Sequence, residues 1–186
     1  MTDPQPPGEV TQLLAKLGDD AEGVSSKVFE MVYARLRQQA SRLMGAGLGK
    51  TLQPTALVHE AWMKMDGNLE GIRDRQHFFG VAGLAMRQIL SDRARRARAL
   101  KRDGGQRDHS SSLEAAAPEL EDELIALDDA LTKLHSLNAR HAQVATLRFL
   151  GGLTIEETAE VVGVSGNTVI TDWAMARAWL KAEIER

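Results

Sequence analysis

GGLTIEETAEVVGVSGNTVITDWAMARAW, residues 151–179, has the pattern of two helices joined by a tight turn. Thr154 is a suitable N-cap, and Glu157 three positions later completes a capping box, in which the two residues satisfy each other's backbone N–H groups. This arrangement predicts a short helix over residues 155–162, and Gly163 is well suited to end it.

The second helix of the pair is expected to begin after Ser165, another N-cap residue. Apolar residues at helical spacing predict its buried side: Val169, Ile170, Trp173, Ala176 and Leu180. The opposite side would present the residues that a recognition helix places in the DNA major groove: Gly166, Asn167, Thr168, Thr171, Asp172 and Met175. The stretch is therefore a candidate helix-turn-helix, although an ordinary helical hairpin has the same spacing.

The composition favours an all-α protein. Leu, Ala, Glu and Arg dominate the 186 residues, only 4% are aromatic, and no sustained alternation of polar and apolar residues indicates strands. Cysteine is absent, no apolar run approaches the ~18 residues of a membrane span, and the acidic N-terminus does not resemble a signal peptide. We therefore expect a cytoplasmic protein without a membrane segment.

Catalytic chemistry finds little support in the sequence. His59-Glu60 begins like the His-Glu-x-x-His helix of zinc proteases, but Met63 stands in place of the second ligand. The other histidines lack ligand spacing with carboxylates, and the glycines at 45, 47 and 49 do not follow a strand, as those of a phosphate-binding loop would. No enzyme activity, cofactor or metal site is expected.

The net charge of −3 hides two blocks of opposite sign. Residues 87–107 contain eight Lys and Arg against two acids, whereas residues 108–129 contain eight acids and no Lys or Arg. Such blocks suggest a basic face for phosphates beside an acidic connector that can mimic nucleic acid or shield the basic face. The alternative is a solvated helix face followed by a charged linker.

The chain divides into a disordered tail (1–9), a helical domain (10–102), a flexible polar linker (103–118) and a four-helix domain (119–186). Apolar periodicity predicts the helices outside the helix-turn-helix over residues 10–17, 27–44, 54–65, 76–99, 119–137 and 139–150. The helix over residues 27–44 should bury Val28, Met31, Val32, Leu36, Ala40 and Leu43. In the helix over residues 76–99 the apolar first half should be buried, and the basic second half should project from it as an arm.

Three segments together resemble the extracytoplasmic-function (ECF) class of bacterial sigma factors. They are LQPTALVHEAWMKM (52–65), HFFGVAGLAMRQILSDRARR (77–96), and ARHAQVATLRFLGGLTIEETAEVVGVSGNTV (139–169) with DWAMARAWL (172–180). The resemblance implies a non-enzymatic protein whose domains bind core RNA polymerase and read promoter DNA. The first domain would correspond to sigma region 2 and hold the −10 element, and the second to region 4 and read the −35 element.

The resemblance also implies roles for individual residues. Phosphate contacts at the −10 element would come from Arg87, Arg93, Arg95, Arg96 and Arg98, and residues 66–77 could cup a flipped base. Contacts at the −35 element would come from Ser165, Asn167, Thr168, Thr171, Arg177 and Lys181, with Arg148 a further candidate. Phe78 and Phe79 could stack on bases or pack in the core.

The resemblance implies that core RNA polymerase is bound at the clamp region of its beta-prime subunit and at its beta flap. The residues implied in the helix that binds the clamp are Gln53, Thr55, Leu57, Val58 and Glu60. Many family members carry an acidic cluster just before this Leu-Val-x-Glu, but here the slot reads Gln-Pro-Thr-Ala. Phosphorylation of Thr51 or Thr55 by a Ser/Thr kinase would restore negative charge at a helix N-terminus. Alternatively, both threonines are capping hydroxyls, and Glu60 with apolar contacts suffices.

A second departure concerns the recognition helix, where Ile170-Thr171 follows Thr168-Val169 in place of the usual Lys or Arg. Base readout would then rest on Asn167, Thr168 and Thr171.

Two other functional classes stay open. A conventional helix-turn-helix regulator would bind a two-fold-symmetric operator without polymerase, and a protein-interaction module would use the basic arm as a partner surface.

Overall fold

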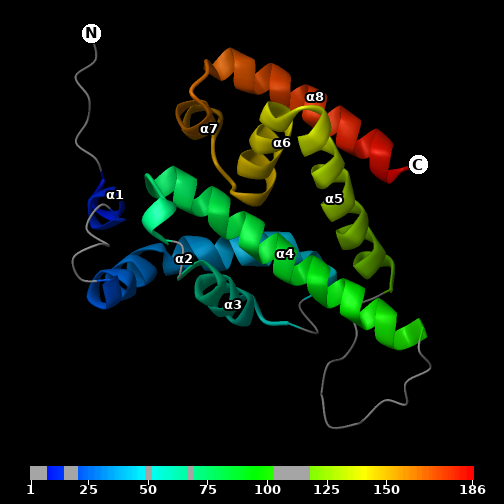
Figure 1. Cartoon of the computed structure of the whole chain (residues 1–186), viewed down its shortest axis with the longest axis horizontal. Coiled ribbons are helices and arrows are strands. Elements are labelled where there is room, and N and C mark those ends of the chain that lie inside the picture. Colours follow the sequence, from blue (N-terminus) through cyan, green and yellow to red (C-terminus); the bar gives the residue numbers. More distant parts are fainter. Residues whose placement is uncertain (1–7, 15–20, 49–51, 67–68, 103–117) are drawn as a thin grey trace.

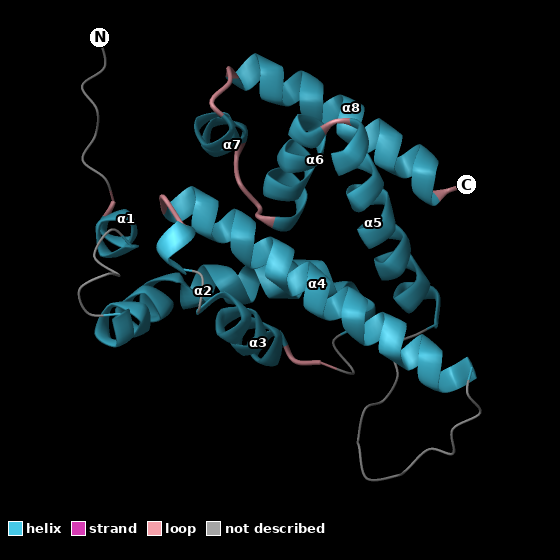
Figure 2. Ribbon diagram, in the orientation of Figure 1, coloured by secondary structure: helices cyan, strands magenta, loops and turns pink. Residues whose placement is uncertain are grey.

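The computed structural model describes residues 8–14, 21–48, 52–66, 69–102 and 118–186. These residues form helices joined by short loops, with no strand among them (Figure 2). In chain order they are α1 (Glu9–Leu14), α2 (Ala21–Leu48), α3 (Pro54–Asp66), the 3-10 turn η1 (Leu69–Gly71), α4 (Arg75–Arg102), α5 (Pro118–Leu137), α6 (Ala139–Ala145), the π-helical turn η2 (Thr146–Leu150), α7 (Ile155–Val162) and α8 (Gly166–Ile184). The all-α prediction is confirmed. No helix in the described part of the chain is long and apolar enough to cross a membrane.

The N-terminal half, α1–α4, is built around an apolar core between α2, α3 and α4. Phe78 and Phe79 of α4 are fully buried in this core. The centroids of their rings lie 5.4 Å apart in an edge-to-face arrangement. They therefore pack the helix and do not reach bases. In α2 the buried residues recur every fourth position from Val28, and Met31 lies off that row and is 42% exposed, contrary to the prediction.

The C-terminal half, α5–α8, has its own smaller core formed by α5, α6 and α8. Thr154 and Glu157 form the predicted capping box, α7 ends at Gly163 in the left-handed conformation (φ 74°), and Ser165 caps α8. Asn138 caps α6 by accepting a hydrogen bond from the backbone N–H of His141 at 3.1 Å. These local predictions are confirmed.

The two halves pack directly against each other across α4 (Figure 1). Leu147 of η2 and Leu153 after it join the core of the N-terminal half. The approach is close because Gly80 and Gly83 have no side chains: a Cβ on Gly83 would lie 2.7 Å from the carbonyl of Leu150. The predicted linker and tail lie largely outside the described residues, which omit 1–7 and 103–117.

The second half of α4 does not stand out into solvent as an isolated basic arm. It runs alongside α5 in Figure 1, and α4 with α5 is the most extensive helix pair in the molecule as described. The sequence prediction of a protruding arm is therefore wrong for this conformation, because an acidic helix covers one side of it.

Candidate nucleic-acid interface

Three arginines on α4 form ion pairs with aspartates on α5. Arg87 Nη1 lies 2.6 Å from Asp128 Oδ1, and Arg95 Nη2 lies 2.9 Å from Asp128 Oδ2. Arg95 also contacts Asp129 at 2.7 Å. Nearer the linker, Arg98 pairs more loosely with Asp122 at 3.4 Å. One carboxylate, that of Asp128, thus binds two guanidinium groups at once.

The other two arginines of the predicted −10 surface differ from these three. Arg93 binds Glu60 of α3, so this pair joins two helices of the N-terminal half. Arg96 is exposed. The structure therefore places the five arginines along one helix but leaves them in different states: three against α5, one against α3 and one facing solvent.

Arg87 is the most enclosed of the set, with a side chain 10% exposed. Burial lowers the pKa of Arg87, the Asp128 carboxylate opposes this, and Arg95 adds to the lowering. For Arg95, the hydrogen bond to Asp128 raises the pKa. Since an arginine is ordinarily charged far above neutral pH, both guanidinium groups stay cationic while they are paired with the aspartates.

The helix-turn-helix exposes the first turns of α8. Asn167 and Thr171 point to solvent, and the Thr171 hydroxyl donates to the backbone oxygen of Asn167 at 3.1 Å. Ser165 and Thr168 are engaged with each other, because Ser165 Oγ accepts from the Thr168 N–H at 3.2 Å and their hydroxyls lie 2.9 Å apart. Asn167 and Thr171 are thus the polar side chains best placed for base edges.

The sequence placed Asp172 on the outward face of α8, and the structure contradicts this prediction. Its side chain is only 5% exposed and is held by Arg140 Nε at 2.7 Å and by His141 Nε2 at 3.3 Å. It turns inward because it lies three residues after buried Val169 on the same side of the helix. Ile170, predicted to be buried, is 49% exposed because it is one residue out of phase with that row.

Cationic side chains that could reach phosphates are fewer than predicted in the C-terminal half. Arg177 and Lys181 are exposed on α8, and Lys181 makes only a loose pair with Glu185 at 3.7 Å. Arg148 instead donates to the backbone oxygen of Leu153 and is half-buried. It therefore supports the loop before α7.

The predicted polymerase-binding residues lie on and before α3. Gln53 is exposed, Thr55 is half-buried in the first turn, and Thr51 lies outside the described residues. Leu57 and Val58 are fully buried, so their side chains belong to the core and cannot directly touch a partner. Sequence reasoning missed a different residue: the side of α3 that bears exposed His59 also bears Met63, which is 70% exposed.

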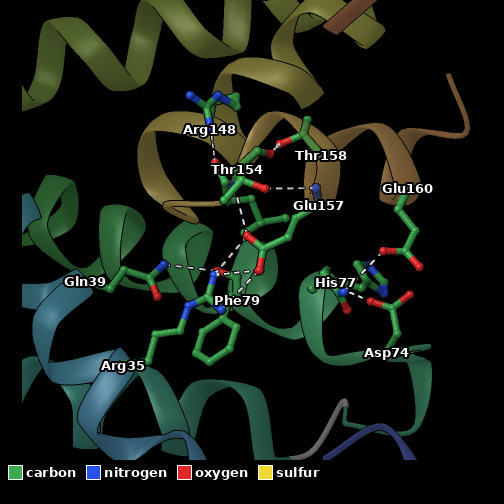
Figure 3. A network of polar contacts seen from close by, with 12 residues as sticks. Arg35, Gln39, Asp74, His77, Phe79, Arg148, Thr154, Glu157, Thr158 and Glu160 are labelled. Atoms are coloured by element: carbon green, nitrogen blue, oxygen red, sulfur yellow. Dashed lines mark hydrogen bonds and ion pairs between the residues drawn. The ribbon is translucent and has the colours of Figure 1, made fainter. Parts of the chain in front are cut away.

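A polar network between α2 and α7 was also missed (Figure 3). Arg35 lies 4.2 Å over the Phe79 ring and binds Glu157 Oε2 at 3.3 Å, so the capping residue of α7 also joins the two halves. Nearby, buried Gln39 Nε2 donates to the backbone oxygens of Leu150 at 2.7 Å and Phe79 at 3.0 Å. Nothing local in the sequence marks these partners, because Arg35 and Glu157 lie 122 residues apart and Gln39 and Leu150 lie 111 residues apart.

Comparison with known proteins identifies the family of the chain. A family model described as ECF sigma factor matches residues 7–186. No curated protein matches the chain.

Proposed function

The chain belongs to the ECF sigma factor family, and from this premise we infer that α4 and α8 contact the two promoter elements and that threonine phosphorylation controls binding to core RNA polymerase. ECF sigma factors are non-enzymatic transcription factors that bind core RNA polymerase and promoter DNA. What carries the assignment to these helices is the presence, in one chain, of a capped helix-turn-helix and a row of arginines along α4.

The α4 arginines suit the backbone of the −10 element. Guanidinium groups bind phosphates through paired N–H donors, and such contacts supply affinity without reading sequence. Arg96 is already exposed, and Arg95 and Arg98 remain partly open to solvent beside their aspartate partners. The N-terminal half would thus hold promoter DNA along α4.

The outer face of α8 suits an A·T-containing −35 element. An asparagine side chain pairs with the N6 and N7 edge of adenine, and exposed apolar side chains contact the methyl group of thymine. Asn167 offers the amide, and Ile170 and Met175 are about half exposed beside it.

Asn167→Ala should therefore weaken binding to the cognate promoter by about 1–3 kcal/mol while leaving binding to random duplex unchanged. Equal losses on both would argue against base readout.

The N-terminus of α3 is where phosphorylation would act. Its first turn contains no acidic residue, and a helix N-terminus stabilises negative charge. A phosphate on Thr55 would lie in that turn, and one on Thr51 just before it. Exposed Gln53 lies next to this charge, exposed Met63 lies about two turns further along α3, and a Ser/Thr kinase would be the regulating partner.

The test is the affinity of the full chain for core RNA polymerase, with the protein unmodified, phosphorylated, and as Thr51→Glu/Thr55→Glu. The matched control is Thr51→Gln/Thr55→Gln, which has nearly the same size without the charge. We expect the charged forms to bind more tightly by about 1–3 kcal/mol and to support promoter-dependent transcription.

The alternatives predict different results. Tight binding by the unmodified chain keeps the sigma role and rejects the phosphorylation switch. Absence of polymerase binding in every form, combined with specific binding to a two-fold-symmetric duplex, would favour a conventional helix-turn-helix regulator. Salt-insensitive binding to a protein but not to DNA would favour an interaction module.

A further inference from the structure

The acidic surface of α5 follows the arginines of α4 along the helix. Arg98 pairs with Asp122, Arg95 with Asp128 and Asp129, and Arg87 with Asp128. Residue numbers rise on one helix as they fall on the other, so the two helices run antiparallel with their charges in register. The carboxylates occupy the same side-chain donors that a row of phosphates would need.

The same closed arrangement is held at its other end by contacts that involve no aspartate of α5. Gly83 lies against the backbone of Leu150, buried Gln39 bonds the Leu150 carbonyl, and Arg35 binds Glu157. Closure of the two halves is therefore built from close backbone packing as well as from charge. It is a specific arrangement, and separation of the halves would break all of these contacts together.

We propose that α5 is an intramolecular competitor of promoter DNA, which in the closed chain occupies Arg87, Arg95 and Arg98 and keeps the isolated protein from binding DNA. This inference rests on the proposed function of α4 as the −10 surface. Opening of the two halves exposes the arginines, so the apparent DNA affinity is the affinity of the open chain multiplied by the fraction of chains that are open. Partners that separate the halves therefore activate DNA binding.

The first test removes the charge of the competitor. The triple variant Asp122→Asn/Asp128→Asn/Asp129→Asn is compared with Glu9→Gln/Glu30→Gln/Glu156→Gln, whose three carboxylates lie outside α5, are exposed and form no ion pair with another described residue. Both triples remove the same number of charges, so general attraction to DNA rises equally. We expect the aspartate triple to bind a random-sequence duplex about fivefold or more tightly than its control.

Salt dependence provides a second readout on the same variants. Each phosphate newly bound by an arginine steepens the logarithmic dependence of DNA affinity on salt by about 0.9. Release of three arginines should thus steepen the slope by roughly 2–3 in the aspartate triple alone.

A variant without any charge change separates opening from electrostatics. Gly83→Ala places a methyl group 2.7 Å from the Leu150 carbonyl and from Gln39 Nε2, and alanine favours the helix itself. Its control is Gly71→Ala, where a Cβ meets nothing within 4 Å. Gly83→Ala should raise affinity for the duplex, and Gly71→Ala should not.

The proposal is overturned if neither the aspartate triple nor Gly83→Ala exceeds its control. Failure of the proposed function looks different. In that case the variants still differ from their controls in DNA binding, but no form of the chain supports promoter-dependent transcription with core RNA polymerase.

Discussion

Asp172 is a charged residue of α8 that points inward, where Arg140 and His141 bind its carboxylate. The arrangement fixes α8 against α6, so the exposed Asn167 and Thr171 are held at a defined angle. It also means that a residue expected from the sequence to face DNA instead orients the helix on which it lies. Asp172 is therefore a positioning residue.

We expect Asp172→Asn to destabilise the full chain by about 1–3 kcal/mol, because the buried Asp172 side chain loses the charge that strengthens its bonds from Arg140 and His141. The measurement is urea unfolding followed by circular dichroism. Asp92→Asn, which removes an exposed carboxylate from α4, is the control and should change stability little. Equal effects of the two substitutions would show that the Asp172 contacts contribute nothing specific.

His77 makes stability depend on pH. Burial lowers the pKa of its ring, Arg73 lowers it further, and Asp74 only partly opposes them. Nδ1 accepts a hydrogen bond from the Arg73 backbone N–H at 3.3 Å, which requires the neutral ring. As pH falls through the ordinary histidine pKa of about 6.5, the unfolded chain takes up a proton before the folded chain does, so stability declines.

We therefore expect the wild-type chain to lose more stability than His77→Gln between about pH 7.5 and about pH 5.5. Urea midpoints of both proteins at the two pH values provide the comparison. Parallel pH profiles for the two proteins would contradict the prediction.

At the scale of elements, α7 depends on one cap that serves two purposes. Thr154 Oγ1 accepts from the Glu157 N–H at 3.1 Å, and Glu157 Oε2 accepts from the Thr154 N–H at 2.8 Å while also binding Arg35. Although burial raises the pKa of Glu157, the bonds from Thr154 and Arg35 outweigh it, and the net shift is downward. The carboxylate thus stays ionised in both roles at neutral pH.

Removal of the cap should cost the helix-turn-helix measurable stability. Thr154→Ala leaves the Glu157 N–H without its acceptor, and we expect a loss of about 1 kcal/mol in urea unfolding. Thr154→Ser keeps the hydroxyl and should retain most of the stability. An equal loss in both variants would assign the effect to the methyl group and not to the cap.

At the scale of the whole molecule, the two halves are closed over α4 in the arrangement of Figure 1. The chain contains no cysteine, so two introduced cysteines would be its only sites for thiol-reactive dyes. Gln38 on α2 and Ala182 on α8 are exposed and belong to opposite halves.

We expect energy transfer between dyes at Gln38→Cys and Ala182→Cys to fall when core RNA polymerase is added, because the proposed role of α4 at the −10 element requires α5 to move away from it. Addition of Gly83→Ala to the labelled chain should lower the transfer without polymerase, and Gly71→Ala should leave it unchanged. Unchanged transfer in the polymerase complex would mean that the closed arrangement is the active one.

The sequence by itself determined the features that depend on neighbours within a turn or two. The cap at Thr154, the stop at Gly163 and the start after Ser165 were predicted at the residues where the structure has them. Local hydrogen bonds and glycine's freedom at positive φ do not require any distant partner. Helical periodicity also predicted Val28, Val32, Leu36 and Ala40 as buried residues of α2, although it wrongly included Met31.

Only the tertiary structure decided which surfaces meet. The sequence showed a basic block beside an acidic one, but the antiparallel register that places Asp128 between Arg87 and Arg95 depends on how α5 packs after the linker. The inward turn of Asp172 likewise depends on where α6 presents Arg140. Charge attraction has no direction or register of its own, so close packing of backbones, as at Gly83, selects one pairing among several.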